Sequence, residues 1–133
     1  MQITIPWCWF DTLSGEGERK IKAARRKEDT GHGRKLLCYH CRNPITEAGM
    51  GIVFNGNHIH SRVNPAGITY DFACYRQASG CTVAGPPTRE HSWFAGYAWQ
   101  IALCGECGEH MGWRFLGEDG FFGLILGRLI EGE

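Results

Sequence analysis

The sequence predicts a mainly β protein, and three observations support this. Glycine and proline recur at short intervals beyond residue 43. No segment there sustains a helical period for three turns, and the runs between the breaks are short enough to suit strands. This punctuation is typical of antiparallel sheets with many turns. The expected strands are 51–54, 68–72, 98–103, 111–116 and 121–126.

The chain of 133 residues has the length of one domain. Residues 16–35 carry eight of the fourteen Lys and Arg residues against four acids, and almost no apolar side chains. A helix of that composition has no face to bury. We therefore expect a flexible extension over 1–35, most mobile over 14–34, and an ordered domain over 36–133. The alternative is that this segment is a basic arm that touches nucleic acid or anionic lipid.

Composition excludes several classes of protein. The formal net charge is zero, so the molecule lacks the basic excess typical of nucleic-acid binding. Its apolar runs are too short to span a membrane, and its first residues do not read as a signal peptide. Seven cysteines are an odd number for a disulfide framework. A reducing, cytoplasmic setting is the natural expectation.

Two Cys-x-x-Cys pairs are the firmest chemical signal. A tight turn brings both thiolates of such a pair to one side, and two pairs supply the closed tetrahedral set that structural Zn²⁺ prefers. The 62 residues between the pairs exceed ordinary zinc-ribbon spacing, so the metal would join distant parts of the chain. The expected ligands are Cys38, Cys41, Cys104 and Cys107.

Three of the five tryptophans lie within residues 91–115, on both sides of the second cysteine pair. Apolar residues alternate over 97–103 and over 113–115, as in two strands that flank a turn. One plausible register sets Trp99 directly across from Trp113, with Cβ atoms roughly 4.5–5.5 Å apart. Trp93 lies in a loop-like segment that can fold back over this pair. The three indoles then either surround a gap or fill a core, and spacing alone leaves both possibilities open.

Several distinctive motifs follow one another along the chain: Cys38-x-x-Cys41, Val63-Asn-Pro-Ala-Gly67, Gly85-Pro-Pro, Glu90-His-Ser-Trp-Phe-Ala-Gly-Tyr-Ala-Trp99, Cys104-x-x-Cys107, His110-Met-Gly-Trp-Arg-Phe115 and Phe122-Gly-Leu124. In this order they resemble the CULT domain family, the thalidomide-binding domain of cereblon. The resemblance covers about residues 36–130, and the short length is similar to that of single-domain bacterial members. Ala95 stands where eukaryotic members have proline, which loosens the loop that carries Trp93.

The resemblance implies a β-tent, in which two antiparallel sheets meet at a steep angle and are pinned by a structural zinc. It also implies a three-tryptophan cage for a cyclic imide such as glutarimide, or for a peptide that carries one, with uridine-like rings as further candidates. Main-chain groups of His91 and Trp93 would hydrogen-bond the imide, Asn64 would lie nearby and Tyr97 would flank the cage. The implied ligand-binding residues are Asn64, His91, Trp93, Tyr97, Trp99, Trp113 and Phe115.

Such a site requires no general base, nucleophile or open metal position, so a binding module rather than an enzyme is expected. Residues 1–35 are too short for the further domains of eukaryotic cereblon, so no site for a ubiquitin-ligase adaptor is expected. Two alternatives remain. One is a methionine sulfoxide reductase-like enzyme, which would need Cys74 or Cys81 as its nucleophile. The other is a cage for methylammonium groups, for which Glu90 is the only acid near the motif.

Overall fold

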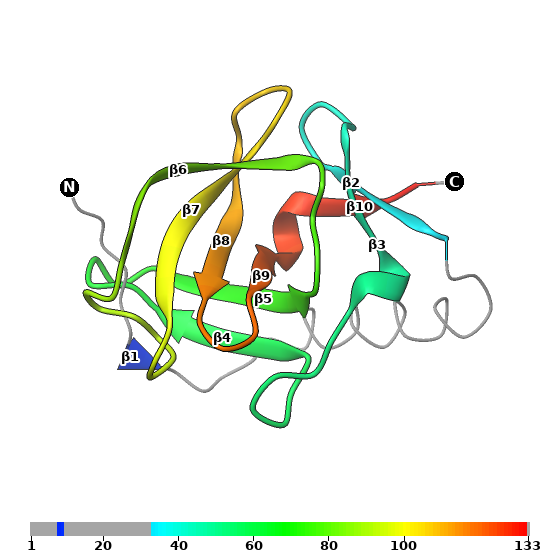
Figure 1. Cartoon of the computed structure of the whole chain (residues 1–133). Helices are drawn as coiled ribbons and strands as arrows, with labels where there is room; N and C mark the ends of the chain where they lie inside the picture. The colour runs from blue at the N-terminus through cyan, green and yellow to red at the C-terminus, as the bar shows by residue number, and fades with distance from the viewer. Residues whose placement is uncertain (1–7, 10–32, 133) are drawn as a thin grey trace.

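The structure is a computed structural model that describes residues 8–9 and 33–132. Its strands form two antiparallel sheets, one ordered β1-β4-β5-β9-β8-β7-β6 and one ordered β10-β2-β3 (Figure 1). This confirms the mainly β prediction and the two antiparallel sheets. The strands are β1 (Cys8–Trp9), β2 (Lys35–Cys38), β3 (Pro44–Glu47), β4 (Ile59–Val63), β5 (Thr69–Tyr75), β6 (Cys81–Thr88), β7 (Ala98–Cys104), β8 (His110–Leu116), β9 (Phe121–Ile125) and β10 (Leu129–Glu131), with short 3₁₀ helices η1 (Ala48–Met50) and η2 (Leu126–Arg128).

Four of the five expected strands are present as β5, β7, β8 and β9. The strand expected over 51–54 is wrong, because the chain turns back at Asn55 and Gly56. Both residues have left-handed backbone, with φ values of 52° and 86°. Phe54 and Asn57 then exchange two backbone hydrogen bonds of 2.9 and 3.1 Å across a tight turn. Asn-Gly is the dipeptide that favours this geometry, so the local signal for a turn outweighed the apolar run.

Strands β2, β3, β4, β6 and β10 were not expected from the sequence. Strand β6 contains Pro86 and Pro87, which normally argue against a strand. It lies at the edge of the larger sheet, where a missing N–H is tolerated because no further strand follows.

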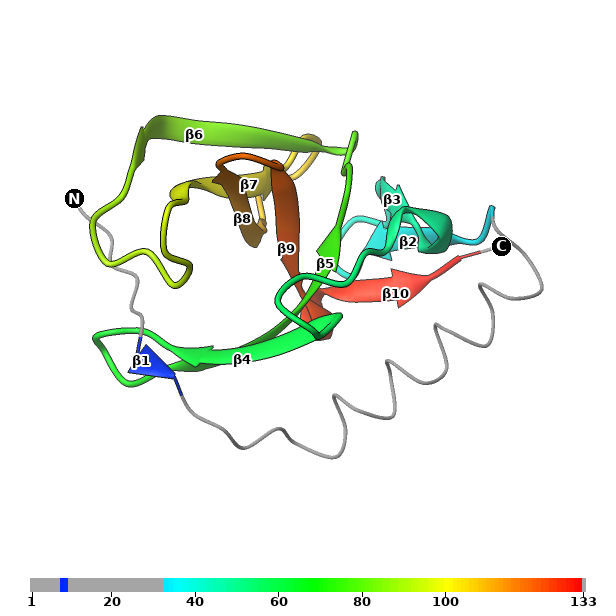
Figure 2. The same cartoon turned by 60° about the horizontal axis from the view of Figure 1, so that its bottom comes forward.

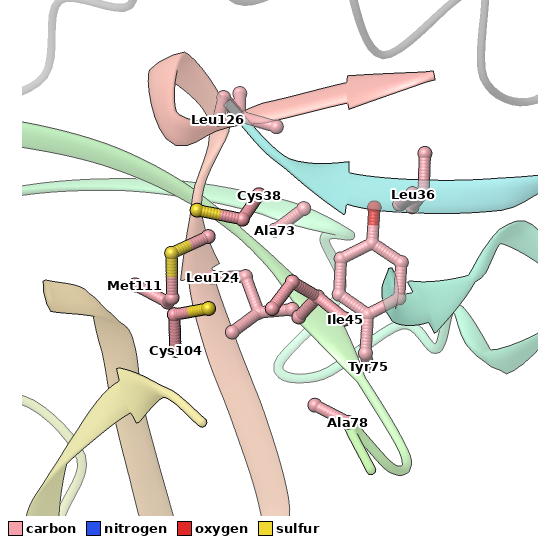
Figure 3. Packing of buried hydrophobic residues seen from close by; sticks show 10 residues of the cluster. All are labelled: Leu36, Cys38, Ile45, Ala73, Tyr75, Ala78, Cys104, Met111, Leu124 and Leu126. Atoms are coloured by element: carbon pink, nitrogen blue, oxygen red, sulfur yellow. The ribbon is translucent and has the colours of Figure 1, made fainter. Parts of the chain in front are cut away.

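The two sheets meet over a buried cluster that includes the ends of β2 and β7. Strand β9 leads directly through η2 into β10, so the chain passes from the larger sheet into the smaller one (Figure 1). Figure 3 shows the side chains that fill this junction, with the Cys38 and Cys104 sulfurs at one side of the cluster. The junction contains Leu36, Cys38, Ile45, Ala73, Tyr75, Ala78, Cys104, Met111, Leu124 and Leu126.

The opposite face of the larger sheet carries the aromatic cluster. Along β5, Phe72 and Cys74 join this cluster whereas Ala73 and Tyr75 face the junction, as the alternation of a strand requires. The sheet curves so that β4 and β6 lie on opposite sides of this interior, and the β6–β7 loop crosses one end of it (Figure 2). The buried members are Phe72, Cys74, Phe94, Trp99, Trp113, Phe115, Phe121 and Ile125.

Most of the expected flexible extension, residues 1–7 and 10–32, lies outside the described residues. Within it, Cys8 pairs with Val63 and Trp9 with Arg62, so β1 adds to β4 as an antiparallel strand. In the part of the chain that the structure describes, no helix is long and apolar enough to cross a membrane.

Candidate functional site: four thiols and an aromatic cluster

The four expected metal ligands lie together where the sheets meet. Cys38 ends β2 in the smaller sheet and Cys104 ends β7 in the larger one. Their partners Cys41 and Cys107 follow in exposed turns, and the four sulfurs lie within 4.8 Å of one another. The closest pairs cross between the two turns, with Cys38 Sγ to Cys107 Sγ at 3.7 Å and Cys41 Sγ to Cys104 Sγ at 3.6 Å. The cluster can therefore hold a metal ion that links the two sheets.

The surroundings of these sulfurs suit metal-bound thiolates. The main-chain N–H of His40 donates to Cys38 Sγ, and that of Glu106 donates to Cys104 Sγ, both at 3.4 Å. The amide of Asn43 donates to Cys104 Sγ at 3.6 Å. Burial acts to raise the pKa of Cys104, but hydrogen bonds from the main-chain N–H groups of Cys107 and Glu106 and from the Asn43 side chain outweigh it and lower the pKa to about 6. A set of four soft donors with supporting hydrogen bonds fits a thiophilic cation.

A polar clasp connects the two turns on their outer side. The hydroxyl of Tyr39 donates to the carboxylate of Glu109 at 2.7 Å. Arg128 in η2 lies 3.9 Å from the same carboxylate and donates to the carbonyl of His110 at 2.7 Å. The hydrogen bond from Tyr39, together with the negative charge of Glu109, holds the pKa of Tyr39 above its usual value. The clasp therefore restrains the turn that carries each cysteine pair.

Trp93 and Trp113 meet at a right angle within the aromatic cluster. Their ring centroids are 4.8 Å apart and their planes cross at 78°. Trp93 also stacks on Phe72, with centroids 5.3 Å apart and planes at 14°. Trp113 comes from β8 and is only 2% exposed, whereas Trp93 comes from the β6–β7 loop and is half-buried. The two indoles thus pack edge to face, one supplied by a strand and one by a loop.

Trp99 shares the sheet face of Trp113 but does not lie opposite it. The register pairs Trp99 with Phe115 and Ile101 with Trp113, so the expected register is wrong by two residues. The cause is a longer turn, because Cys104 N–H bonds to the carbonyl of Glu109 and a bulge follows at Ala102/Leu103. A shift of two residues preserves the face, so both indoles still point into the aromatic cluster.

The indole N–H of Trp99 donates to the carbonyl of Glu90 at 2.8 Å. This bond fixes the ring of a side chain that is 6% exposed. Within residues 33–132, no other aromatic ring contacts Trp99, in contrast to Trp93 and Trp113. The three indoles therefore share one face of the sheet, but only two of them touch.

The loop before β7 places backbone groups beside these indoles. His91 has a φ of 58°, a left-handed conformation that is uncommon for residues other than glycine. Ser92 N–H bonds to the Arg89 carbonyl at 3.1 Å and Tyr97 N–H bonds to the Phe94 carbonyl at 3.0 Å, closing two turns around Trp93. Such strained conformations cluster at binding sites. Among the described residues, the main-chain N–H of Trp93 has no backbone acceptor.

The remaining expected ligand residues take different positions. Asn64 begins the β4–β5 turn, where its side-chain oxygen accepts from Ala66 N–H and Ile68 N–H, each at 2.9 Å. The ring of Tyr97 packs on Phe54 at 5.3 Å and touches none of the three tryptophans. Phe115 is buried, and its ring centroid lies 6.5 Å from that of Trp93.

Sequence reasoning missed several residues that surround the indoles. Tyr70 and His110 each contact Trp113 edge-on at 5.1 Å, and Phe94 packs on Phe115 at 5.0 Å. Burial and the nearby Arg128 lower the pKa of His110 to about 4, so it is neutral near pH 7. Tyr70 and Phe72 lie within the strand expected over 68–72, so alternation along that strand could have placed both on one face.

Comparison with known proteins finds several cereblons among the relatives of this chain. No family model matches the chain. Protein cereblon of Gallus gallus is 41% identical over 81 residues, which are 53% of this chain and 18% of that protein. Cereblon of Xenopus tropicalis is 38% identical over 89 residues (60% and 18%), and that of Danio rerio is 40% identical over 74 residues (51% and 17%). The matched stretch thus spans less than a fifth of these relatives. Over about half of its length, with two antiparallel sheets and four clustered thiols, this chain is thus similar to the corresponding part of cereblon.

Proposed function

We propose that this domain is a binding module for cyclic imides. Trp93, Trp99 and Trp113 would contact the imide ring. The observation that carries the proposal is the perpendicular pair of Trp93 and Trp113, which shares one sheet face with Trp99 and adjoins a loop with left-handed His91. The similarity to cereblon supports the same ligand class, because the motifs that carry the resemblance supply these residues.

The physical chemistry of an imide suits such walls. The CH₂ groups of a glutarimide ring gain roughly 25 cal/mol per Å² when indoles cover them. Its N–H and carbonyls need partners there, since an unpaired group costs about 1–3 kcal/mol. The main-chain N–H of Trp93 is one such partner for a carbonyl oxygen, and the carbonyl of His91 is the proposed acceptor of the imide N–H. The ligand is a free cyclic imide or a peptide that carries one.

We further propose that Cys38, Cys41, Cys104 and Cys107 hold one Zn²⁺. Four sulfurs within 4.8 Å of one another can converge on a single tetrahedral ion. Four protein ligands leave no open position for water, so the ion would serve to join the sheets. Its contribution would be to folding rather than to chemistry.

The thiols outside this set support a binding role rather than an enzyme. Burial raises the pKa of Cys74 to about 12, and burial together with the nearby Cys104 and Cys38 raises that of Cys81 to about 12 as well. A nucleophilic cysteine needs the opposite shift, because the thiolate is the reactive form. The two cysteines on which a reductase would depend are therefore poorly suited to it.

The charge around the cluster also disfavours a methylammonium ligand. The guanidinium carbon of Arg62 lies 5.3 Å from the centre of the Phe94 ring, so a cation already occupies this side of the cluster. A second cation would meet repulsion from Arg62, whereas a neutral imide would not.

A fluorescence titration tests the proposal, with glutarimide, succinimide, uridine, N-methylglutarimide and choline compared on the same chain. Glutarimide is expected to bind with a dissociation constant between micromolar and low millimolar, about −4 to −8 kcal/mol. N-methylglutarimide should fail to bind, because it lacks the donor and adds a methyl group against the loop. Binding of choline without binding of glutarimide would replace this proposal with the methylammonium site.

A further inference from the structure

Arg62 lies on the same face of the sheet as the aromatic cluster. The β4–β5 register pairs Arg62 with Tyr70, and directly opposed residues point to one face. The ring of Tyr70 contacts Trp113 at 5.1 Å, and the guanidinium of Arg62 lies over Phe94, the residue next to Trp93. Arg62 therefore lies beside Tyr70, which contacts Trp113, and beside Phe94, which follows Trp93 in the chain.

The charge of Arg62 has no acidic partner within residues 33–132. Its Nη1 donates to the adjacent carbonyl of Ser61 at 2.8 Å. The acid nearest along the paired strands, Asp71, is opposite Ser61 and accepts a hydrogen bond from the Ser61 hydroxyl on the other face of the sheet. Burial lowers the pKa of Arg62 from its usual value. Partial burial of a cation that has no carboxylate partner costs folding free energy, and a negatively charged group on a ligand could offset that cost.

Two further donors in this region lack acceptors among the described residues. The side-chain oxygen of Asn64 accepts hydrogen bonds from the main-chain N–H groups of Ala66 and Ile68. These two bonds fix which atom of the amide is the oxygen. Its NH₂ group, two residues beyond Arg62 along the chain, has no acceptor among the described residues. The indole N–H of Trp93 is buried and has no hydrogen-bond partner. This side of the aromatic cluster is rich in donors and carries a positive charge.

From this arrangement we infer an anion-binding subsite at Arg62 and the Asn64 amide, beside the three tryptophans. The inference rests on the proposed imide site and narrows its ligand class. The preferred ligand is a cyclic imide that carries a carboxylate or a phosphate, with the imide among the indoles and the anion at Arg62. Both anions share the chemistry that a guanidinium recognises, namely two acceptor oxygens on one negatively charged group.

The test compares two pairs of ligands that differ only in the anion. One pair is glutarimide and its 4-carboxylate, and the other is uridine and uridine 5′-monophosphate. At low ionic strength at least one charged member should bind about tenfold more tightly than its neutral partner, and the gain should shrink at high ionic strength. The pair that shows the gain identifies carboxylate or phosphate as the preferred anion.

Substitutions at two arginines test whether the tighter binding of the charged ligand depends on Arg62. Arg62→Gln should abolish the difference within each pair, and Arg62→Lys should retain part of it. Arg114→Gln is the matched control, because Arg114 also lies over a phenylalanine, 6.0 Å from the centre of Phe122, but alternates with Trp113 and Phe115 to the other face of β8. That variant should leave the difference intact.

The outcomes separate this inference from the proposed function. If neutral imides bind but neither charged member binds more tightly, the anion subsite is refuted and the imide site stands. The same conclusion follows if Arg114→Gln removes the gain as fully as Arg62→Gln, because the effect then reflects net charge alone. If no neutral imide binds, the proposed function fails and the anion subsite fails with it.

Discussion

The indole of Trp93 packs edge-to-face against that of Trp113, with centroids 4.8 Å apart, although one side chain belongs to a loop and the other to the centre of a sheet. The contact ties the β6–β7 loop to β8. Because the two residues differ in burial, the same substitution at each should have different consequences.

We expect Trp93→Ala to fold and to lose imide binding, whereas Trp113→Ala should be strongly destabilised. Trp93 is half-buried and its N–H is unsatisfied, so its loss should cost about 1–2 kcal/mol. Trp113 is 2% exposed and packs against Tyr70, Phe72 and Trp93, so its loss should cost about 3–5 kcal/mol. Urea denaturation and a glutarimide titration measure both quantities. A stable Trp93→Ala variant that still binds glutarimide normally would contradict the proposed site.

Replacing Cys107 by serine should release the metal and remove most of the folded population, since structural zinc supplies folding free energy. Cys81→Ser is the control, because Cys81 lies opposite Cys104 in the β6–β7 register but is outside the four-thiol set. Elemental analysis should find one zinc per chain in the wild type and in Cys81→Ser. Folded protein without metal, or a disulfide within either cysteine pair, would rule out the zinc site.

Stability should fall as the pH falls from about 6.5 to about 4. Burial, with a smaller effect of nearby charges, lowers the pKa of both His60 and His110 to about 4. Between these values the unfolded chain binds more protons than the folded one, so acid favours unfolding, by about 2 kcal/mol for each histidine after allowing for partial exposure. Urea midpoints across this range should show the slope. His60→Gln should remove about half of it, and the same change at the exposed His40 should not.

A methyl group at Gly123 should disturb the aromatic cluster. A Cβ at this position would lie 2.7 Å from the ring of Phe72 and 3.0 Å from that of Phe115. Gly123→Ala should therefore destabilise the domain by about 1–3 kcal/mol, as overpacking does. Gly127→Ala is the matched control, because a Cβ there meets nothing within 4 Å. Equal urea midpoints for the two variants would show that the cluster adapts without cost.

Local signals in the sequence were sufficient for the mainly β class, for four strands and for the two cysteine turns. These features depend on residues close together in the chain: alternation in β7 and β8, glycine and proline between strands, and two thiols on one tight turn. The resemblance to the cereblon domain added which distant motifs belong together. The convergence of Cys38 and Cys41 with Cys104 and Cys107 across 62 residues was predicted from the two cysteine pairs themselves, because four thiols complete one tetrahedral metal site.

Only the tertiary structure decided what each of these elements contacts. The length of the cysteine turn set Trp99 opposite Phe115 instead of Trp113, because one bulge changes a register that alternation alone cannot specify. The side-chain oxygen of Asn64 accepts a hydrogen bond within its own turn. The curvature of the sheet brings Arg62 of β4 against Phe94 of the β6–β7 loop. Such contacts depend on how the sheets pack and on which polar groups remain unpaired. Neither can be predicted from the pattern of residues that are neighbours in the sequence.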